Sequence, residues 1–280
     1  MHPGLEWLRE LPEGRAWLER LPRLVEECRQ QWSLELEEPF RYAHASLAIP
    51  AGDSVLKVRF PDRESEHEPD ALAVWRGDGA ARLVARDDER HAFLIERCRP
   101  GTSLRHAGQE HAIAVFVDLL PRLWRPARPP FRSPAAEAEW WAAGLRERAD
   151  ARGHPLEQEL VNAALVALAE LGPTQGPQVL VHQDLLADNV LRAEREPWLV
   201  IDPKPLVGER EFALAPIIRS FELGDREQDV LYRLDRLSAG LGLDRDRARR
   251  WTIAQTIAWA IGSDYLERHV QTARWLLQAK

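Results

Sequence analysis

The stretch between residues 179 and 208 constrains the fold of this chain more than any other part of the sequence. It reads as short apolar strands separated by polar turns. Asp184 comes just after the first strand, Asn189 follows it by five residues, and Asp202 ends the next apolar strand. Polar side chains at the ends of buried strands are held in place by a rigid scaffold. We therefore expect these three side chains to belong to a functional site.

The spacing of these side chains suits phosphoryl transfer. In that reaction one carboxylate orients the attacking hydroxyl and accepts its proton, while a second carboxylate and an amide oxygen hold Mg²⁺ against the phosphates. Asp184 and Asn189 have the spacing of a kinase catalytic loop, and Asp202 stands where a later strand supplies the metal-binding carboxylate. An Asp and an Asn five residues apart are, by themselves, more often a simple turn. The assignment therefore depends on the features that accompany them.

Lysine usage singles out two further positions. Of 38 basic residues, only Lys57, Lys204 and the C-terminal Lys280 are lysines. In a chain so biased towards arginine, an internal lysine indicates a place where a compact ammonium is wanted and a guanidinium fork is not. Chance survival is the competing explanation, and the positions of Lys57 and Lys204 argue against it.

Lys57 lies in an alternating, strand-like run that precedes a helical pattern. The alternation puts Val55 and Lys57 on one face of the strand. A strand lysine on such a face is usually just solvated, but a kinase needs one to hold the α- and β-phosphates, paired to a helix glutamate. Glu68 is the expected partner, with Glu64 and Glu66 as competitors. Val55 would then lie over the nucleotide base.

The periodicity predicts an α+β chain in three parts. These are a helical extension over 1–38, a lobe over 39–97 with an antiparallel sheet and one helix, and a mainly helical lobe over 98–280. Pro12 and Pro22 are expected to break the helices of the extension.

The individual elements follow from apolar spacing and turn residues. They are helices within 3–34, a hairpin of Ala43–Ile49 and Ser54–Phe60, a helix over 64–75, strands Arg82–Ala85 and Ala92–Glu96, a hinge at Cys98–Thr102, a loop over Arg122–Pro134 with Ser133 as N-cap, a helix over Pro155–Leu171, strands Val179–His182 and Trp198–Ile201, and helices from Glu211 to Lys280.

Composition narrows the class of protein. The net charge of −7 argues against a general nucleic-acid binder, which would present a basic face. The two cysteines, Cys28 and Cys98, belong to no metal-binding or disulfide pattern, which favours a reducing cytoplasm. We expect no membrane span, because no run approaches eighteen apolar residues.

Four segments carry a resemblance to a known family. They are VLKV at 55–58, LIERCRPGTSL at 94–104, HQDLLADNVL at 182–191 and IDPKPLVGEREF at 201–212. With these segments the chain resembles the aminoglycoside/hydroxyurea antibiotic-resistance kinases, the streptomycin-phosphotransferase-like branch of the protein-kinase-like superfamily. The Asp-Pro-Lys-Pro sequence after the strand is the most specific of the four.

The resemblance implies a protein-kinase-like two-lobe fold and the transfer of the γ-phosphate of ATP or GTP to a hydroxyl, with Mg²⁺. It implies that Asp184 is the catalytic base, that Asn189 and Asp202 are Mg²⁺ ligands, and that Lys57 holds the nucleotide phosphates. The backbone of Glu96–Cys98 would hydrogen-bond the purine edge.

Two more residues of the matching segments have implied roles. His182 is expected to brace the catalytic loop. Lys204 is expected either to place a positive charge near the transferring phosphate or to pack its stem against the metal-binding loop.

The sequence also departs from the family pattern. Gln183 and Leu186 stand where the loop usually reads His-Gly-Asp-Leu-His, and Leu186 removes a polar side chain two residues after the base. Ala213 stands where an aspartate commonly ties the catalytic loop from below. A glycine-rich phosphate loop is not visible, so the first hairpin is expected to cover the phosphates without one.

Carboxylates are the expected contacts of the acceptor. Aminoglycosides carry ammonium groups, so their kinases present carboxylates around the acceptor. The candidate carboxylates are Glu209, Glu211, Glu222, Asp225 and Asp264, although each resembles the many surface acids of this chain. An aminoglycoside-like or amino-sugar acceptor is expected. The alternatives are a choline, fructosamine or sugar kinase, or a non-catalytic nucleotide-binding module, which Leu186 and Ala213 would favour.

Overall fold

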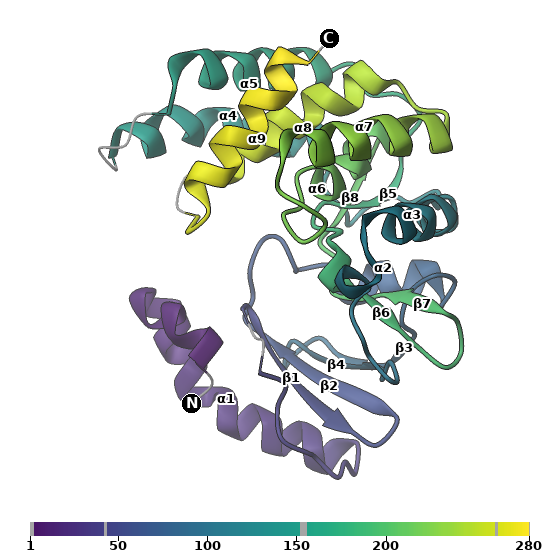
Figure 1. Cartoon of the computed structure of the whole chain (residues 1–280). Helices are drawn as coiled ribbons and strands as arrows, with labels where there is room; N and C mark the ends of the chain where they lie inside the picture. The colour runs from purple at the N-terminus through teal and green to yellow at the C-terminus, as the bar shows by residue number, and fades with distance from the viewer. Residues whose placement is uncertain (1–2, 42–43, 152–155, 261–262, 280) are drawn as a thin grey trace. The chain divides into compact units, whose positions relative to one another are not determined.

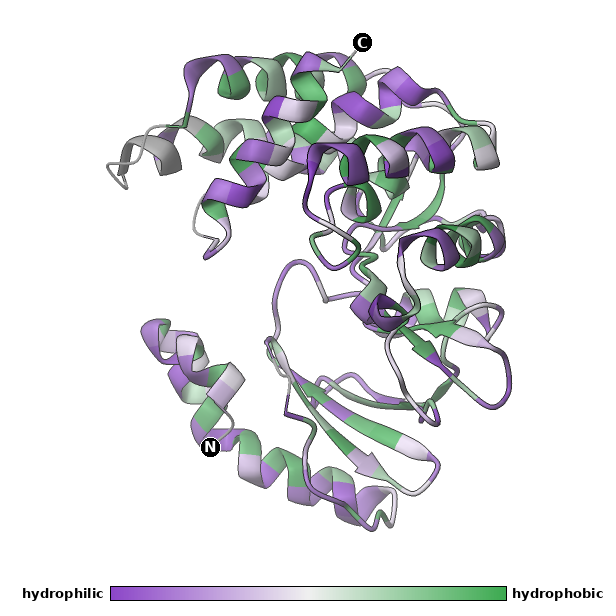
Figure 2. Ribbon diagram, viewed as in Figure 1, coloured by the Kyte–Doolittle hydropathy of each residue, from purple (hydrophilic) through white to green (hydrophobic). Residues whose placement is uncertain are grey.

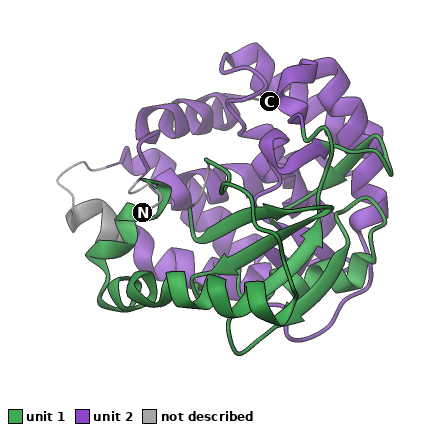
Figure 3. Cartoon of the chain, turned by 90° about the horizontal axis from the view of Figure 1, so that it is seen from below, with its two compact units in different colours: residues 1–101, 192–202 green, residues 102–191, 203–280 purple. Residues whose placement is uncertain are grey.

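The computed structural model describes residues 3–41, 44–151, 156–260 and 263–279. The chain forms two compact units (Figure 3). Unit 1 comprises residues 1–101 and 192–202, and unit 2 comprises residues 102–191 and 203–280. The division of the sequence into 1–38, 39–97 and 98–280 stays a prediction about domains.

Unit 1 is built on a four-stranded antiparallel sheet in the order β1-β2-β4-β3 (Figure 1). The strands are β1 (Ser46–Ala51), β2 (Ser54–Arg59), β3 (Leu83–Asp87) and β4 (Ala92–Glu96). Gly52 has a φ of +59° in the turn between β1 and β2, a conformation that glycine adopts without strain. The predicted hairpin is therefore confirmed from residue 46 onwards, whereas Ala43 lies outside the described residues.

The N-terminal helices complete the core of unit 1. The 3₁₀ helix η1 (Pro3–Glu10) and α1 (Pro12–Gln31) pack on one face of the sheet, where Trp17, Leu56 and Val58 join one apolar cluster. Figure 2 shows the alternation of apolar and polar residues along α1, as expected of a helix with one buried side.

Two helix boundaries differ from the prediction. Pro22 lies inside α1 and does not end it, because Trp17, Leu18 and Leu21 bury the helix in the core and outweigh one lost backbone hydrogen bond. The second helix, α2 (Glu68–Trp75), starts later than residue 64, because Asp62 accepts hydrogen bonds from the following backbone in a turn.

Unit 2 is mainly helical, as predicted. Its α-helices are α3 (Gln109–Leu123), α4 (Pro134–Ala151), α5 (Gln158–Leu171), α6 (Ala215–Ile218), α7 (Glu227–Leu241), α8 (Arg245–Ala260) and α9 (Leu266–Gln278). Its short 3₁₀ helices are η2 (Leu104–Ala107), η3 (Ala187–Asn189) and η4 (Arg210–Leu214). Ser133 accepts from the N–H of Ala136 at the start of α4, which confirms the predicted N-cap. Residues 155, 261–262 and 280, which fall within predicted helices, lie outside the described residues.

Short strands carry the polar segments that the sequence singles out. In unit 2, β5 (Val179–His182) pairs antiparallel with β8 (Pro205–Gly208), with His182 opposite Pro205. The chain passes from unit 2 to unit 1 within β6 (Val190–Arg192) and then forms β7 (Trp198–Val200). The predicted strands Val179–His182 and Trp198–Ile201 are both present, the second one residue shorter.

Within the described ranges, no helix is both long and apolar enough to cross a membrane.

Candidate active site

Unit 1 brings Lys57, Glu68 and Asp202 together. Lys57 lies in the middle of β2, between Ala48 of β1 and Phe93 of β4. Its side chain is buried, and its Nζ lies 2.5 Å from Oε1 of Glu68, at the start of α2, and 2.6 Å from Oδ1 of Asp202. The structure therefore pairs Lys57 with Glu68, the partner expected from the sequence, and not with Glu64 or Glu66.

The position of Asp202 depends on the anchoring of β7. Val200 donates to the C=O of Gly79 and accepts from the N–H of Ala81, both over 2.9 Å. Asp202 follows with a φ of +53°, in the left-handed region that aspartate tolerates better than most residues. Half of its side chain is exposed, and its Oδ2 bonds no described residue, so one oxygen remains available to a ligand.

The charges around Lys57 stabilise its ammonium form. Burial alone would lower the pKa of Lys57, but the carboxylates of Asp202 and Glu68 outweigh that effect and raise it. Lys57 is therefore a permanent cation that can bind an anionic ligand such as a phosphate.

The segment after β4 leaves main-chain groups of the predicted hinge without a hydrogen-bond partner among the described residues. Glu96 donates its N–H to Arg82 over 2.9 Å, and its carboxylate pairs with Arg195. In contrast, the backbone N–H and C=O of Cys98 bond no other described residue. Burial raises the pKa of the Cys98 thiol to about 12, so this side chain is not a nucleophile. Val55 is buried in the adjoining strand, on the same face as Lys57.

Unit 2 brings Asp184, Asn189, His182 and Lys204 together. Nδ1 of His182 accepts from the backbone N–H of Asp184 over 3.1 Å and from that of Lys204 over 3.4 Å. One imidazole therefore joins the loop after β5 to the segment before β8, as a bracing histidine would.

Two cations flank the carboxylate of Asp184. Nζ of Lys204 lies 3.1 Å from Oδ2, and NH2 of Arg219 lies 3.5 Å from Oδ1. Burial favours the neutral acid, but Lys204 and Arg219 hold the pKa of Asp184 below its usual value. Asp184 is therefore ionised at neutral pH and is a strong hydrogen-bond acceptor for a hydroxyl.

Asn189 presents an amide oxygen. Its Nδ2 donates to the C=O of Asp184 over 2.8 Å, which fixes the orientation of the amide. Its Oδ1 makes no hydrogen bond to a described residue. Over residues 3–41, 44–151, 156–260 and 263–279, no group of three or more His, Cys, Asp or Glu side chains is arranged to hold a metal ion. Mg²⁺ needs no such group, because it commonly uses one or two protein oxygens with substrate phosphates and water.

Glu222 contacts the loop that carries Asp184 and Asn189. Its carboxylate accepts the backbone N–H of Asp188 over 3.1 Å. Burial, with the adjacent carboxyl of Asp188, raises the pKa of Glu222 to about 7. Asp188 is in turn bonded by Ser103 and Arg105, over 2.7 and 2.8 Å.

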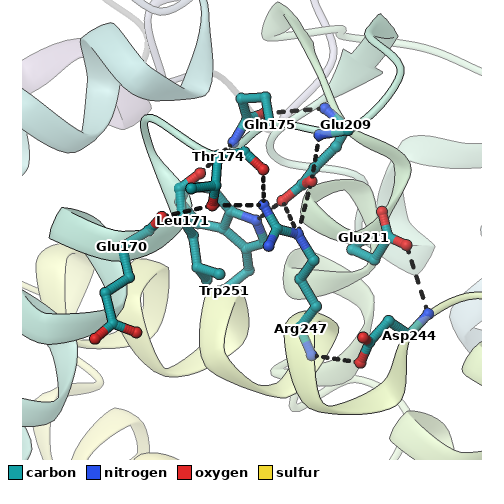
Figure 4. Close-up of polar contacts among 10 residues, drawn as sticks. Glu170, Leu171, Thr174, Gln175, Glu209, Glu211, Asp244, Arg247 and Trp251 are labelled. Atoms are coloured by element: carbon teal, nitrogen blue, oxygen red, sulfur yellow. Dashed lines mark hydrogen bonds and ion pairs between the residues drawn. The ribbon is translucent and has the colours of Figure 1, made fainter.

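Glu209 lies at the centre of a buried clamp (Figure 4). Arg247 donates to both of its oxygens over 2.8 and 2.7 Å, Gly176 donates its N–H over 2.9 Å, and Trp251 donates its indole N–H. Both oxygens of Glu209 are thus engaged by protein donors, and its role in acceptor binding stays a prediction. Glu211 lies beside the backbone N–H of Asp244, at 3.5 Å.

Sequence patterns did not single out several residues of these networks. They are Ser103, Arg105, Asp188, Arg219, Arg233, Gln255 and Trp259. Each lies far in sequence from its partner or inside an ordinary helix pattern. Ser103 and Asp188 lie within the segments 94–104 and 182–191 that carry the resemblance, and Asp188 stands between Asp184 and Asn189.

Comparison with solved structures identifies the fold. The chain is similar to the crystal structure of a choline kinase from Streptococcus pneumoniae, with a TM-score of 0.67, and the match covers 93% of this chain and 100% of that one. At 14% sequence identity this likeness shows the fold alone. The chain thus has the protein-kinase-like α+β fold that was predicted.

Sequence comparison identifies relatives. The chain is 36% identical over 279 residues to the hydroxyurea phosphotransferase of Kitasatospora aureofaciens, covering 94% of this chain and 81% of that protein. It is also 36% identical over 257 residues to the streptomycin 6-kinase of Streptomyces griseus, covering 88% of this chain and 83% of that protein.

The comparisons with solved structures and with related sequences define the class of protein. The chain is a small-molecule kinase, a phosphotransferase that acts on hydroxyl groups with a nucleotide as co-substrate. A family model described as aminoglycoside/hydroxyurea antibiotic resistance kinase matches residues 42–264. The chain belongs to this family, which confirms the predicted resemblance, and a non-catalytic module is not favoured.

Proposed function

We propose that this kinase transfers the γ-phosphate of ATP to a hydroxyl of a small cationic acceptor, with Asp184 as the base. The observation that carries this proposal is the pairing of Lys57 with Glu68 and Asp202 within unit 1. In kinases the strand lysine and helix glutamate must be paired for the lysine to hold the α- and β-phosphates. The purine would lie on Val55 and bond the backbone of Glu96–Cys98.

The proposed role of Asp184 follows from its charge state. An ionised carboxylate orients the acceptor hydroxyl and takes its proton late, when the phosphoryl group has largely left the nucleotide. Lys204, which pairs with Asp184, would then supply positive charge that stabilises the transferring group.

The donor atoms of Asn189 and Asp202 suit Mg²⁺. An amide oxygen and a carboxylate oxygen, neither bonded to a described residue, are hard ligands of the kind that Mg²⁺ prefers. When bound, the ion would supply positive charge that offsets the charge of the nucleotide phosphates. Both residues are proposed as ligands on this chemistry.

A cavity of about 270 Å³ in unit 2 is the proposed acceptor site. It is lined by Phe221, Asp225, Glu267, Arg268, Gln271, Thr272 and Trp275. The volume is close to the lower end of small-molecule pockets, about 300 Å³, so it suits one ring of an aminoglycoside or amino sugar. The carboxylates of Asp225 and Glu267 form no ion pair with a described residue, and two aromatic rings accompany them.

One short segment connects this cavity to Asp184. Arg219 contacts Asp184, and Phe221, two residues later, lines the cavity. Arg233 of α7 holds the segment with hydrogen bonds to the C=O groups of Ile218, Ser220, Leu223 and Gly224. An acceptor bound in this cavity would contact the segment of Phe221, and Arg219 of the same segment contacts the proposed base Asp184.

The cellular setting is proposed on chemistry alone. The supply of ATP and the two unpaired cysteines, Cys28 and Cys98, favour the cytoplasm. A monomer or weak dimer is proposed, with no nucleic-acid or membrane partner.

Product analysis by mass spectrometry tests the proposal. Purified protein is incubated with Mg²⁺ and ATP, or GTP, and with streptomycin, hydroxyurea, choline or glucosamine. We expect one cationic acceptor to gain a phosphate and Asp184→Asn to abolish that gain. The double variant Asp225→Asn/Glu267→Gln should raise KM for the acceptor and leave KM for ATP unchanged. Phosphorylation of hydroxyurea alone, unaffected by the double variant, would contradict the cationic acceptor and the cavity. Full activity of Asp184→Asn would contradict the base.

A further inference from the structure

Three side chains of α8 form a stripe along one face of the helix. Trp251, Gln255 and Trp259 are spaced by four residues, which places them on the same side. Each one contacts a segment that carries or supports Asp184, and none belongs to a motif of the active site. This stripe is called the α8 stripe below.

Gln255 is the centre of the α8 stripe and is fully buried. Its Nε2 donates to the backbone C=O of Gln183 over 2.8 Å, and its Oε1 accepts from Nε of Arg219 over 3.2 Å. Gln183 immediately precedes Asp184, and Arg219 contacts the Asp184 carboxylate. One amide therefore fixes both the backbone before the base and one of its two counter-ions.

Trp259 extends this support by one turn. Cζ of Arg219 lies 4.6 Å and Nζ of Lys204 lies 5.3 Å from the centroid of its ring, so the two cations that flank Asp184 share one aromatic platform. Trp141 packs edge-on against Trp259, with the centroids 6.5 Å apart and an interplanar angle of 89°. The platform is thus held by the core of unit 2.

Trp251 anchors the opposite end of the α8 stripe. Its indole N–H donates to Glu209, the residue that follows β8. Because β8 pairs with β5, and β5 leads directly into Asp184, this bond fixes the small sheet on which the catalytic loop is built.

The α8 stripe also accounts for a departure from the family pattern. Ala213 stands where the resemblance implies an aspartate that ties the catalytic loop. Ala213 is buried and has no side-chain hydrogen-bonding group. In this chain Gln255 makes a bond to the loop backbone, from a different helix.

We propose that Gln255 is a positioning residue for phosphoryl transfer, which holds Asp184 in place through the Gln183 carbonyl and Arg219, with Trp259 as the platform for the flanking cations. The inference rests on the proposed function, in which Asp184 is the base. It concerns residues that act through others and touch no substrate.

The test compares Gln255→Leu with Thr256→Val. Thr256 is the neighbouring buried residue of α8, and its hydroxyl bonds no described residue, so its near-isosteric replacement controls for disturbance of the helix. Initial rates are measured with Mg²⁺-ATP and streptomycin, and phosphate release from ATP is measured without an acceptor.

We expect Gln255→Leu to lower kcat by about tenfold to a hundredfold, as small misplacements of catalytic groups do, with KM for ATP unchanged. A merely structural role would reduce the folded fraction without accelerating amide exchange of residues 183–189 in the folded protein. Thr256→Val should match the wild type in both respects.

Two further arms keep the proposal falsifiable. Gln255→Glu keeps an acceptor for Arg219 but loses the donor to Gln183, and is used if the leucine variant does not fold. Amide exchange of residues 183–189 is measured in every variant and should accelerate for both Gln255 variants but not for Thr256→Val, whether or not streptomycin is an acceptor. If both Gln255 variants keep the wild-type kcat and the wild-type rate of amide exchange while Asp184→Asn is inactive, this inference is wrong and the proposed function stands. An active Asp184→Asn would overturn the proposed function.

Discussion

Nζ of Lys204 lies 3.1 Å from Oδ2 of Asp184, so the proposed base carries a counter-ion. The lysine belongs to the Asp-Pro-Lys-Pro segment, and the aspartate to the loop after β5. Their contact lies within unit 2 and joins two of the segments that carry the family resemblance.

Replacing Lys204 should change the pH dependence of the reaction. Lys204 holds the pKa of Asp184 down, so in Lys204→Met that pKa rises and the acidic limb of kcat/KM moves to higher pH. The measurement is a pH–rate profile with Mg²⁺-ATP and the acceptor found by mass spectrometry. Arg23→Met removes an equal charge from the exposed surface of α1 and should leave the profile unchanged. An identical profile in Lys204→Met would contradict the proposed electrostatic role.

Glu68→Gln should weaken the binding of ATP. The variant keeps the shape of the side chain but leaves Lys57 with one carboxylate, so the ammonium is held less firmly for the phosphates. A hydrogen bond to a charged group contributes roughly 1.5–3 kcal/mol, and we expect about a tenfold rise in KM for ATP. Glu66→Gln is the matched control, because Glu66 is exposed and does not contact Lys57. If Glu68→Gln and Glu66→Gln raise KM for ATP equally, Glu68 has no specific role in binding the nucleotide.

Gln183→Met should raise the stability of the protein. The side chain of Gln183 is fully buried, and neither its Oε1 nor its Nε2 bonds a described residue. A buried, unsatisfied polar group costs about 1–3 kcal/mol, so an apolar side chain of similar shape should increase the free energy of unfolding by roughly 1 kcal/mol. Urea unfolding at pH 7 measures the change.

The contrasting variant is Gln255→Met, which removes a bonded amide and leaves the Gln183 carbonyl without its partner. We expect it to be destabilised. If both glutamine variants shift the urea midpoint in the same direction, hydrogen bonding does not distinguish the two sites.

His269 should make the native state sensitive to acid. Burial, assisted by Arg219, lowers the pKa of His269 to about 3. The unfolded chain takes up a proton near the ordinary histidine pKa, about 6.5, whereas the folded chain does not. Stability is therefore fully present above that pH and is lost as the pH falls towards 3, by up to about 1.4 kcal/mol per pH unit.

Urea unfolding between pH 7.5 and pH 4.5 measures this effect. His269→Met should unfold with a weaker pH dependence than the wild type across that range. His106→Met, at an exposed position, serves as the control and should follow the wild type. An unchanged slope in His269→Met would assign the acid sensitivity to other groups.

Much of the fold could be predicted because its signals are local. Alternating residues in 54–60 and the turn at Gly52 produce a hairpin, and the apolar spacing over 158–171 produces a helix. Pro22 shows the limit of such signals: a local helix breaker is overridden when the helix is buried on the core of unit 1. The starting residue of α2 was also set by a side-chain turn that periodicity does not encode.

The sequence by itself determined which residues carry the proposed chemistry. The spacing of Asp184 and Asn189, and the rarity of lysine at 57 and 204, are properties of the chain as written. Only the tertiary structure decided their partners. Lys57 pairs with Glu68 and not with the neighbouring glutamates, and Arg219 contacts Asp184. Glu209 is buried against Arg247, and Gln255 donates to the Gln183 carbonyl. These contacts join residues far apart in the chain, and their energy depends on distance, burial and charge, which sequence spacing does not specify.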